Sequence, residues 1–237
     1  MFYDKALTAN KNRIEEITGK TMAVPLSYES YYHKYGLDHP ALYMIPQEDP
    51  EYIYPVQWGF IPDWAVEDPY SFREKYDTLN VNDKTLFDNN TYNQSILRKR
   101  CLIISDGFFL TCEKNNTVQH HFWYISDESE ISGRSIFMIA GVYNDFDPAD
   151  DLYTAAIITT SVKPSFENFN SSQLKIPLVL DETFCDDSLM GKLDKPHVRE
   201  LLRVGFTVEE LCSHRVSEDL KNINIDTNRS YILNPDQ

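Results

Sequence analysis

The chain has 237 residues, of which 42% are hydrophobic, and a formal net charge of −15 at pH 7. This length and apolar content predict a globular protein with a sizeable core and exclude a disordered chain. Negative charge on this scale repels phosphate backbones at long range, so the overall balance argues against a nucleic-acid binder. A local exception is the basic run Arg98, Lys99 and Arg100, which we interpret as the solvated last turn of a helix, where cations complement the helix dipole.

The cysteines and the N-terminal segment indicate a reduced, cytoplasmic protein. Cys101, Cys112, Cys185 and Cys212 form no CxxC pair and have no His at metal-ligand spacing beside them. Residues 1–19 lack the basic and apolar blocks of a signal peptide. No window approaches the roughly 18–20 consecutive apolar residues of a membrane span. We therefore expect no metal, no cofactor and no membrane partner.

The first hundred residues are predicted to contain helices at both ends and extended segments between them. A short helix is expected over 10–17, with Gly19 just past its end as a stop signal. Segments 41–45 and 51–60 are expected to be extended, and 91–100 is expected to be helical.

The rest of the chain is predicted to be mainly strands, followed by helices. Short strands are expected at 101–104 and 108–112, on either side of a Ser-Asp-Gly turn. The β-branched and aromatic segments that we assign to one antiparallel sheet are 118–126, 135–142 and 152–160, with 176–180 as a further short strand. The helices expected after them are 182–190, 196–204 and 208–212.

These elements predict a single α+β domain over residues 1–237. A twisted antiparallel sheet is expected to curl toward a barrel, with helices outside it.

Residue chemistry alone identifies no active site. The acidic run 145–151 lacks the glycine and the bidentate glutamate of an EF-hand loop, so we interpret it as a solvated turn. His120 and His121 are adjacent in a predicted strand and therefore point to opposite faces. The sequence contains no GxSxG, HExxH or glycine-rich phosphate loop.

Seven segments, in order along the chain, resemble the motifs of one family. They are MFYDKALTA, VQWGFIPDWA, LNVNDKT, RKRCLIISDGFFLT, IFMIAGVYNDF, AAIITTSVKP and KIPLVL. Through these segments the chain resembles the SRAP family of SOS response-associated peptidases and abasic-site processing proteins. The resemblance covers about the first four-fifths of the chain, and it implies the SRAP fold.

In that family a cysteine at the mature N-terminus attacks the aldehyde of an abasic site in single-stranded DNA and forms a stable cross-link. A Glu and a His assist this reaction, an Asn helps to hold the site, and arginines bind phosphates. Here the resemblance places Phe2 at the nucleophile position and Leu110 at the Glu position. The His position falls on Gln173, or on Asn170 in a longer loop alignment, and the Asn is retained as Asn80.

The phosphate-binding positions are also changed. Asp4 and Asn82 replace two arginines of the family pattern, and each lost phosphate contact weakens DNA binding. The segment that the family uses near DNA contributes Trp58, Pro62 and Trp64, which would serve equally well as apolar core.

These replacements leave three hypotheses. The first is an inactive binding module whose more apolar cleft takes a small molecule or a peptide end. The second is retained, non-covalent binding of single-stranded or abasic-site DNA. The third is a regulatory role through protein contacts, which the sequence does not separate from the first.

Overall fold

The computed structural model describes residues 2–114, 117–147, 152–161, 175–191, 193–205 and 211–236. Its helices are α1 (Lys11–Thr18), α2 (Pro69–Lys75), α3 (Ser95–Arg98), α4 (Glu182–Leu189) and α5 (Lys195–Val204). Its strands are β1 (Asp4–Leu7), β2 (Thr21–Met22), β3 (Tyr31–Tyr35), β4 (Ala41–Pro46), β5 (Tyr52–Trp58), β6 (Asn80–Asn82), β7 (Arg100–Ser105), β8 (Gly107–Lys114), β9 (Thr117–Ile125), β10 (Phe137–Asp147), β11 (Leu152–Ser161), β12 (Lys175–Pro177), β13 (Val179–Leu180) and β14 (Leu211–Val216).

Five strands close into a barrel. The antiparallel neighbours run β11, β10, β7, β4 and β5, and a parallel pairing of β11 with β5 completes the circle. Buried apolar side chains from all five strands belong to one core cluster, and the apolar face of α5 packs against the same cluster. The predicted α+β class with a barrel-like β core is therefore confirmed.

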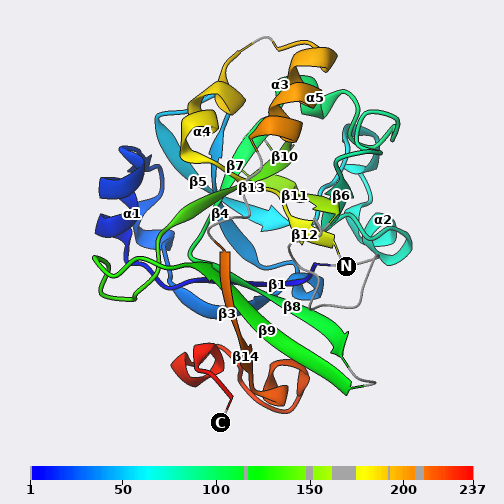
Figure 1. The fold of residues 1–237 in the computed structure, drawn as a ribbon. Helices are drawn as coiled ribbons and strands as arrows, with labels where there is room; N and C mark the ends of the chain where they lie inside the picture. The colour runs from blue at the N-terminus through cyan, green and yellow to red at the C-terminus, as the bar shows by residue number, and fades with distance from the viewer. Residues whose placement is uncertain are drawn as a thin grey trace.

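A second sheet has the strand order β14, β9, β8, β1, β3, and it lies below the barrel in Figure 1. The prediction that 118–126, 135–142 and 152–160 share one sheet was wrong, because β9 belongs to this second sheet while β10 and β11 belong to the barrel. The chain changes sheets at the Ser-Asp-Gly turn. Ser105 Oγ donates to the carbonyls of Ala6 and Gly107, and a Cβ on Gly107 would lie 2.1 Å from Cζ of Phe122. Only glycine fits this approach of β8 to β9.

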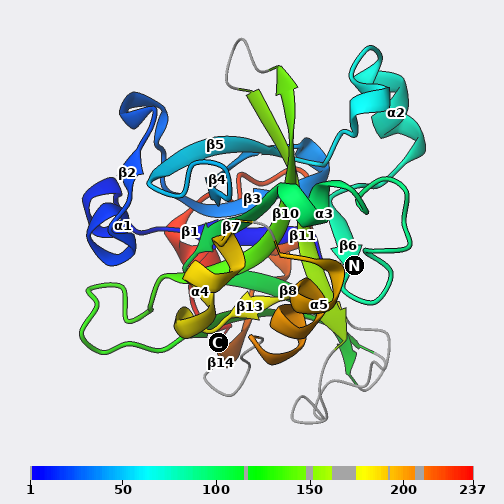
Figure 2. The same ribbon diagram turned by 90° about the horizontal axis from the view of Figure 1, so that it is seen from above.

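The first predicted helix is confirmed as α1. Asn10 Oδ1 accepts from the backbone N–H of Arg13 at 3.0 Å, and Gly19 ends the helix at φ +66°. The view from above shows α1 on the opposite side of the barrel from α2 (Figure 2).

Two helix predictions were wrong. Only Ser95–Arg98 of the segment 91–100 is helical, since Arg100 already starts β7. The end of the predicted helix 208–212 is strand, because Leu211 and Cys212 pair with the free edge of β9. Residues 206–210 lie outside the described part of the chain.

Arg98 is exposed in the last turn of α3, as expected for the basic run, but Arg100 is not part of a solvated surface. Arg100 is buried, and burial lowers the pKa of its guanidinium to about 10. Its N–H groups donate to carbonyls at the C-terminal ends of α3 and α4, namely those of Ile96, Leu97, Ser188, Met190 and Gly191. Arg100 therefore satisfies carbonyls that the two helices leave without an intrahelical partner.

Within the described residues, no helix is long and apolar enough to cross a membrane.

Candidate functional site

Phe2 lies in the core, two residues before the start of β1. Its side chain is 0% exposed, and its ring centroid is 5.6 Å from that of Trp58 and 5.8 Å from that of Phe108. Trp58 is itself fully buried and donates its Nε1–H to the carbonyl of Leu79 at 2.8 Å. The position that the resemblance assigns to the nucleophile therefore holds a packed aromatic ring.

Asn80 holds the backbone of this residue in place. Its Nδ2 donates to the carbonyl oxygen of Phe2 at 2.5 Å, and its Oδ1 is buried without a partner among the described residues. β6 carries Asn80 and pairs in parallel with β11 of the barrel. The structure thus brings Phe2, Trp58, Phe108 and Asn80 together, and we call these four residues the N-terminal cluster.

Leu110 belongs to the same apolar core. It is 3% exposed, lies on β8 opposite His121 of β9, and is part of the core cluster that contains Phe2. A leucine cannot transfer a proton, so the side chain at this position contributes only to the packing of the core. Gln173 and Asn170, the alternatives for the His position, lie outside the described residues.

Asp4 is buried next to a cation from the far end of the chain. Both carboxylate oxygens accept from Lys221 Nζ at 2.6 Å, and Asp4 Oδ1 is 3.0 Å from Nε2 of His33. His33 Nδ1 is 2.7 Å from the hydroxyl of Thr227. The charge that replaces an arginine of the family pattern is therefore matched within the molecule. Sequence reasoning missed Lys221 and His33; the available signal was an aspartate in an apolar strand, which requires a cation.

Asn82 stabilises a turn. Its Nδ2 donates to the carbonyl of Thr159 at 3.3 Å, and its Oδ1 accepts from the backbone N–H of Lys84 at 3.2 Å. Both ends of this amide are thus used inside the protein.

The second tryptophan of the motif is on the surface. Pro62 is buried and precedes a 3₁₀ turn (Asp63–Ala65), while Trp64 in that turn is 63% exposed with its ring edge-on to Phe72. Tyr70, Lys75 and Tyr76, on α2 and the residue after it, are also exposed, while Arg73 of α2 is half-buried and donates to Oε1 of Gln57. We call Trp64, Tyr70, Arg73, Lys75 and Tyr76 the aromatic surface.

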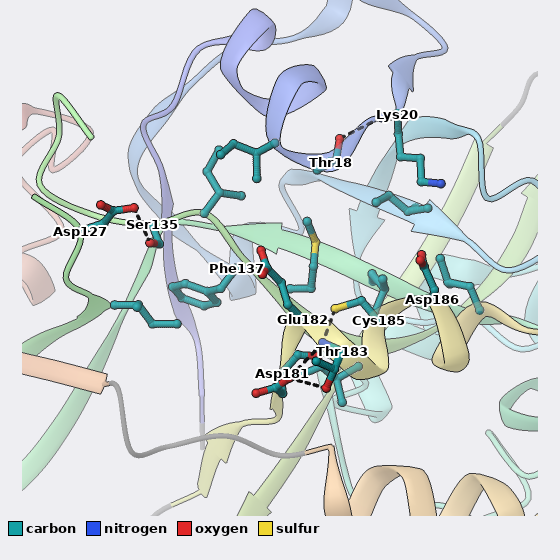
Figure 3. Close-up of a pocket in the computed structure, with 18 of the residues that line it drawn as sticks. Thr18, Lys20, Asp127, Ser135, Phe137, Asp181, Glu182, Thr183, Cys185 and Asp186 are labelled. Atoms are coloured by element: carbon teal, nitrogen blue, oxygen red, sulfur yellow. Dashed lines mark hydrogen bonds between the residues drawn. The ribbon is translucent and has the colours of Figure 1, made fainter. Parts of the chain in front are cut away.

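Two hollows lie away from the N-terminal cluster. The larger has a volume of about 790 Å³ and lies between α1, α4 and the segment before β10; sequence reasoning did not identify it (Figure 3). The smaller, of about 260 Å³, is lined by His33 and by residues 225–228. Neither is lined by Phe2, Asn80 or Leu110. In the part of the chain that the structure describes, no three His, Cys, Asp or Glu side chains converge to hold a metal ion.

Known proteins resemble this chain in sequence and in fold. A protein named abasic site processing protein HMCES from Gallus gallus is 26% identical over 190 residues, which cover 73% of this chain and 54% of that protein. This chain therefore spans about half the length of that relative. The abasic site processing protein YoqW of Bacillus subtilis (strain 168) is 23% identical over 164 residues, which cover 68% of each chain.

Solved structures share the fold. A crystal structure of a protein from Bacteroides thetaiotaomicron superposes with a TM-score of 0.83 at 22% identity, covering 99% of this chain and 100% of that one. A second, from Bordetella bronchiseptica, has a TM-score of 0.72 at 16% identity and covers 92% of this chain and 100% of that one. The model of the SOS response associated peptidase (SRAP) family matches residues 5–223. Since that match extends over most of the sequence, the chain belongs to the SRAP family.

Proposed function

We propose that this SRAP protein has a DNA-damage-related role that does not involve covalent reaction with abasic sites. The family and the names of its relatives support the DNA-related part. The burial of Phe2 is the single observation that carries the second part.

A covalent reaction requires a nucleophile that reaches the aldehyde carbon and a group that moves protons beside it. Phe2 supplies a hydrocarbon ring enclosed by Trp58 and Phe108, and Leu110 supplies a buried alkyl chain. Because nucleophile and acid–base groups act as a unit, replacing both removes the reaction rather than slowing it slightly.

The surroundings of Asp4 also disfavour a phosphate. A DNA phosphate approaching Asp4 meets a carboxylate that already holds Lys221 at 2.6 Å. Binding it would require breaking that ion pair and placing two anions side by side, which costs several kcal/mol in a buried setting (order of magnitude).

The full burial of Phe2 also disfavours a small molecule or peptide end at that position, because the ring fills the space. The proposed role is therefore one of binding or regulation through other surfaces, without chemistry at the N-terminal cluster.

An abasic-oligonucleotide assay tests this proposal. The full chain is incubated with a single-stranded oligonucleotide that carries one abasic site, and the products are run on a denaturing gel. We expect no band of protein linked to DNA. A polylysine sample trapped with borohydride verifies that the aldehyde is reactive, and a stable protein–DNA band would refute the proposal.

Non-covalent binding of single-stranded DNA is the second candidate, and the aromatic surface favours it. Trp64, Tyr70 and Tyr76 are 63%, 81% and 53% exposed, beside Arg73 and Lys75. Exposed aromatic rings next to cations are what sequence-tolerant stacking of bases requires, at about 1–3 kcal/mol per base.

A salt titration separates this candidate from no DNA binding. A fluorescent single-stranded oligonucleotide without an abasic site is titrated at low and at physiological salt, with Trp64→Ala as the variant. Binding at low salt that weakens at least about five-fold in the variant supports stacking on this surface. Equal binding by the variant and the parent chain eliminates it.

A further inference from the structure

The larger hollow has an apolar floor that the proposed function does not use. Its volume of about 790 Å³ lies within the range of about 300–1,000 Å³ typical of ligand pockets. The floor consists of side chains from four strands: Ile45, Leu102, Phe137, Met138 and Leu180. No residue of the N-terminal cluster lines it, so the hollow is separate from that cluster.

Carboxylates border this floor on two sides. Asp127 and Glu130 lie on the segment between β9 and β10. On the other side, Asp181 is the N-cap of α4, and Glu182 and Asp186 lie within that helix. Figure 3 shows Phe137 between Asp127 on one side and Asp181 and Glu182 on the other. The lining residues thus contain five acidic side chains against a single cation, Lys20.

Four of these five carboxylates form no ion pair among the described residues, although the Arg13 guanidinium contributes to the lowered pKa of Asp127. Glu130 pairs with Arg13, and Lys20 pairs with Glu51 at 3.4 Å, so this glutamate and this lysine are matched. None of the ion pairs among the described residues involves the four others, which are Asp127, Asp181, Glu182 and Asp186.

Asp127 and Asp181 accept hydrogen bonds from neutral donors. Asp127 accepts from the hydroxyls of Ser129 and Ser135, and Asp181 accepts from Thr183 at the N-terminus of α4. These bonds hold the carboxylates as anions, and they keep the pKa of both carboxyl groups below the usual range. The hollow is therefore an apolar surface between two anionic edges, in a chain whose formal charge is −15.

From this charge pattern we propose that the hollow is a docking site for a short basic, amphipathic segment of a partner protein. A bulky apolar side chain of the segment rests on Phe137 and Met138, and Lys or Arg residues on either side of it face Asp127 and the Glu182–Asp186 edge. The arrangement suits such a peptide because the apolar stems of Lys and Arg cover the floor while their charged ends reach the carboxylates. Acidic peptides and phosphorylated ligands are excluded by the same charges.

Fluorescence anisotropy with the full chain tests this proposal. The probe is a fluorescein-labelled peptide, Lys-Arg-Leu-Phe-Lys-Arg, compared with Glu-Asp-Leu-Phe-Glu-Asp and with Lys-Arg-Ser-Ser-Lys-Arg. We expect saturable binding of the first peptide, at least about ten-fold weaker binding of the Ser-Ser peptide, because it lacks two large apolar side chains, and no binding of the acidic one.

A matched pair of charge variants localises the binding. Glu182→Gln with Asp186→Asn removes two charges from the rim, and Glu67→Gln with Glu74→Gln removes two exposed charges elsewhere; no ion pair among the described residues involves any of the four. We expect about five- to ten-fold weaker binding in the first variant and less than about two-fold change in the second.

Each other outcome would overturn the proposal. Equal weakening in both variants indicates attraction to the net charge alone, and equal binding of the Ser-Ser peptide removes the role of the floor. Complete displacement of the probe by an equimolar aliphatic diamine identifies a site for small organic cations instead. Absence of binding by all three peptides rejects the docking site. The abasic-oligonucleotide assay does not depend on any of these results.

Discussion

The carbonyl oxygen of Phe2 accepts a hydrogen bond from the side-chain amide of Asn80, with 2.5 Å between O and Nδ2. The two residues are 78 positions apart in the sequence. The bond links the segment just before β1 of the second sheet to β6, which pairs with the barrel. Asn80, which the resemblance implies as a site residue, therefore has a structural use here, and that use can be measured.

Replacing Asn80 by alanine is expected to destabilise the fold. The carbonyl of Phe2 would lose its donor in a largely buried place, which costs about 1–2 kcal/mol of the free energy of unfolding. Urea denaturation measures the change. Asn80→Asp is the control for side-chain size, because it keeps the shape but replaces the donor by an acceptor, and it should destabilise at least as much. A change below about 0.3 kcal/mol in both variants would show that the bond contributes nothing.

Phe2→Cys is expected not to restore cross-linking to an abasic site. Leu110, in the same core cluster, would still provide no carboxylate for a thiol at this position, and removing the ring leaves a cavity between Trp58 and Phe108. The free energy of unfolding should fall by about 2–4 kcal/mol. The denaturing gel measures the first effect and urea denaturation the second. Phe2→Leu is the packing control, with a loss of about 1–2 kcal/mol. A linked band from the cysteine variant would contradict the prediction.

Lys5 makes the stability depend on pH above neutrality. Its Nζ is fully buried and donates to the hydroxyl of Tyr31 at 3.1 Å and to the carbonyl of Ile104. Burial lowers the pKa of this ammonium group to about 7, although the nearby Asp106 carboxylate opposes the shift. The unfolded chain keeps a lysine pKa of about 10.4. Between these values the unfolded state binds a proton that the folded state does not, so stability rises with pH.

The comparison with Lys5→Met isolates this contribution. Relative to the variant, the parent chain should gain stability from pH 7 to pH 10 at up to about 1.4 kcal/mol per pH unit, and the difference should be constant below pH 6. Urea denaturation at pH 6, 7, 8.5 and 10 measures both slopes, and effects of the net charge cancel in the difference. Parallel curves for the two proteins across this range would rule out the lowered lysine pKa.

The ion pair of Asp4 with Lys221 is expected to anchor the C-terminal segment. Lys221→Ala would leave the buried carboxylate of Asp4 with His33 as its remaining partner, at a cost of about 1–3 kcal/mol. A double-mutant cycle with Asp4→Asn measures the coupling, which should exceed about 1 kcal/mol. Additive effects of the two substitutions would show that the pair is not coupled. Asp4→Arg, which introduces the charge that the resemblance implies at this position, should destabilise more than Asp4→Asn because it faces Lys221.

Local sequence patterns predicted the parts of the fold that depend on near neighbours. The helix at α1 follows from Asn10 and Gly19, whose capping contacts span three or four residues. Part of the strand Leu211–Val216 was predicted to be helical. Its partner β9 lies about ninety residues earlier in the chain, and a local sequence pattern does not indicate a pairing over that distance. Arg100 likewise was expected on the surface, and its burial depends on carbonyls that end α4 at residues 188–191.

The sequence by itself determined the family and the residue types at the positions that the resemblance implies, because motifs are short and a side chain's chemistry is set by its type. Phe2 and Leu110 lack a nucleophile and a proton-transfer group in any fold. Only the tertiary structure decided that the Phe2 ring is enclosed, that Asp4 meets Lys221 from 217 positions away, and that an apolar floor lies between two acidic edges. These features depend on contacts between segments distant along the chain, which arise when the barrel closes and the second sheet forms.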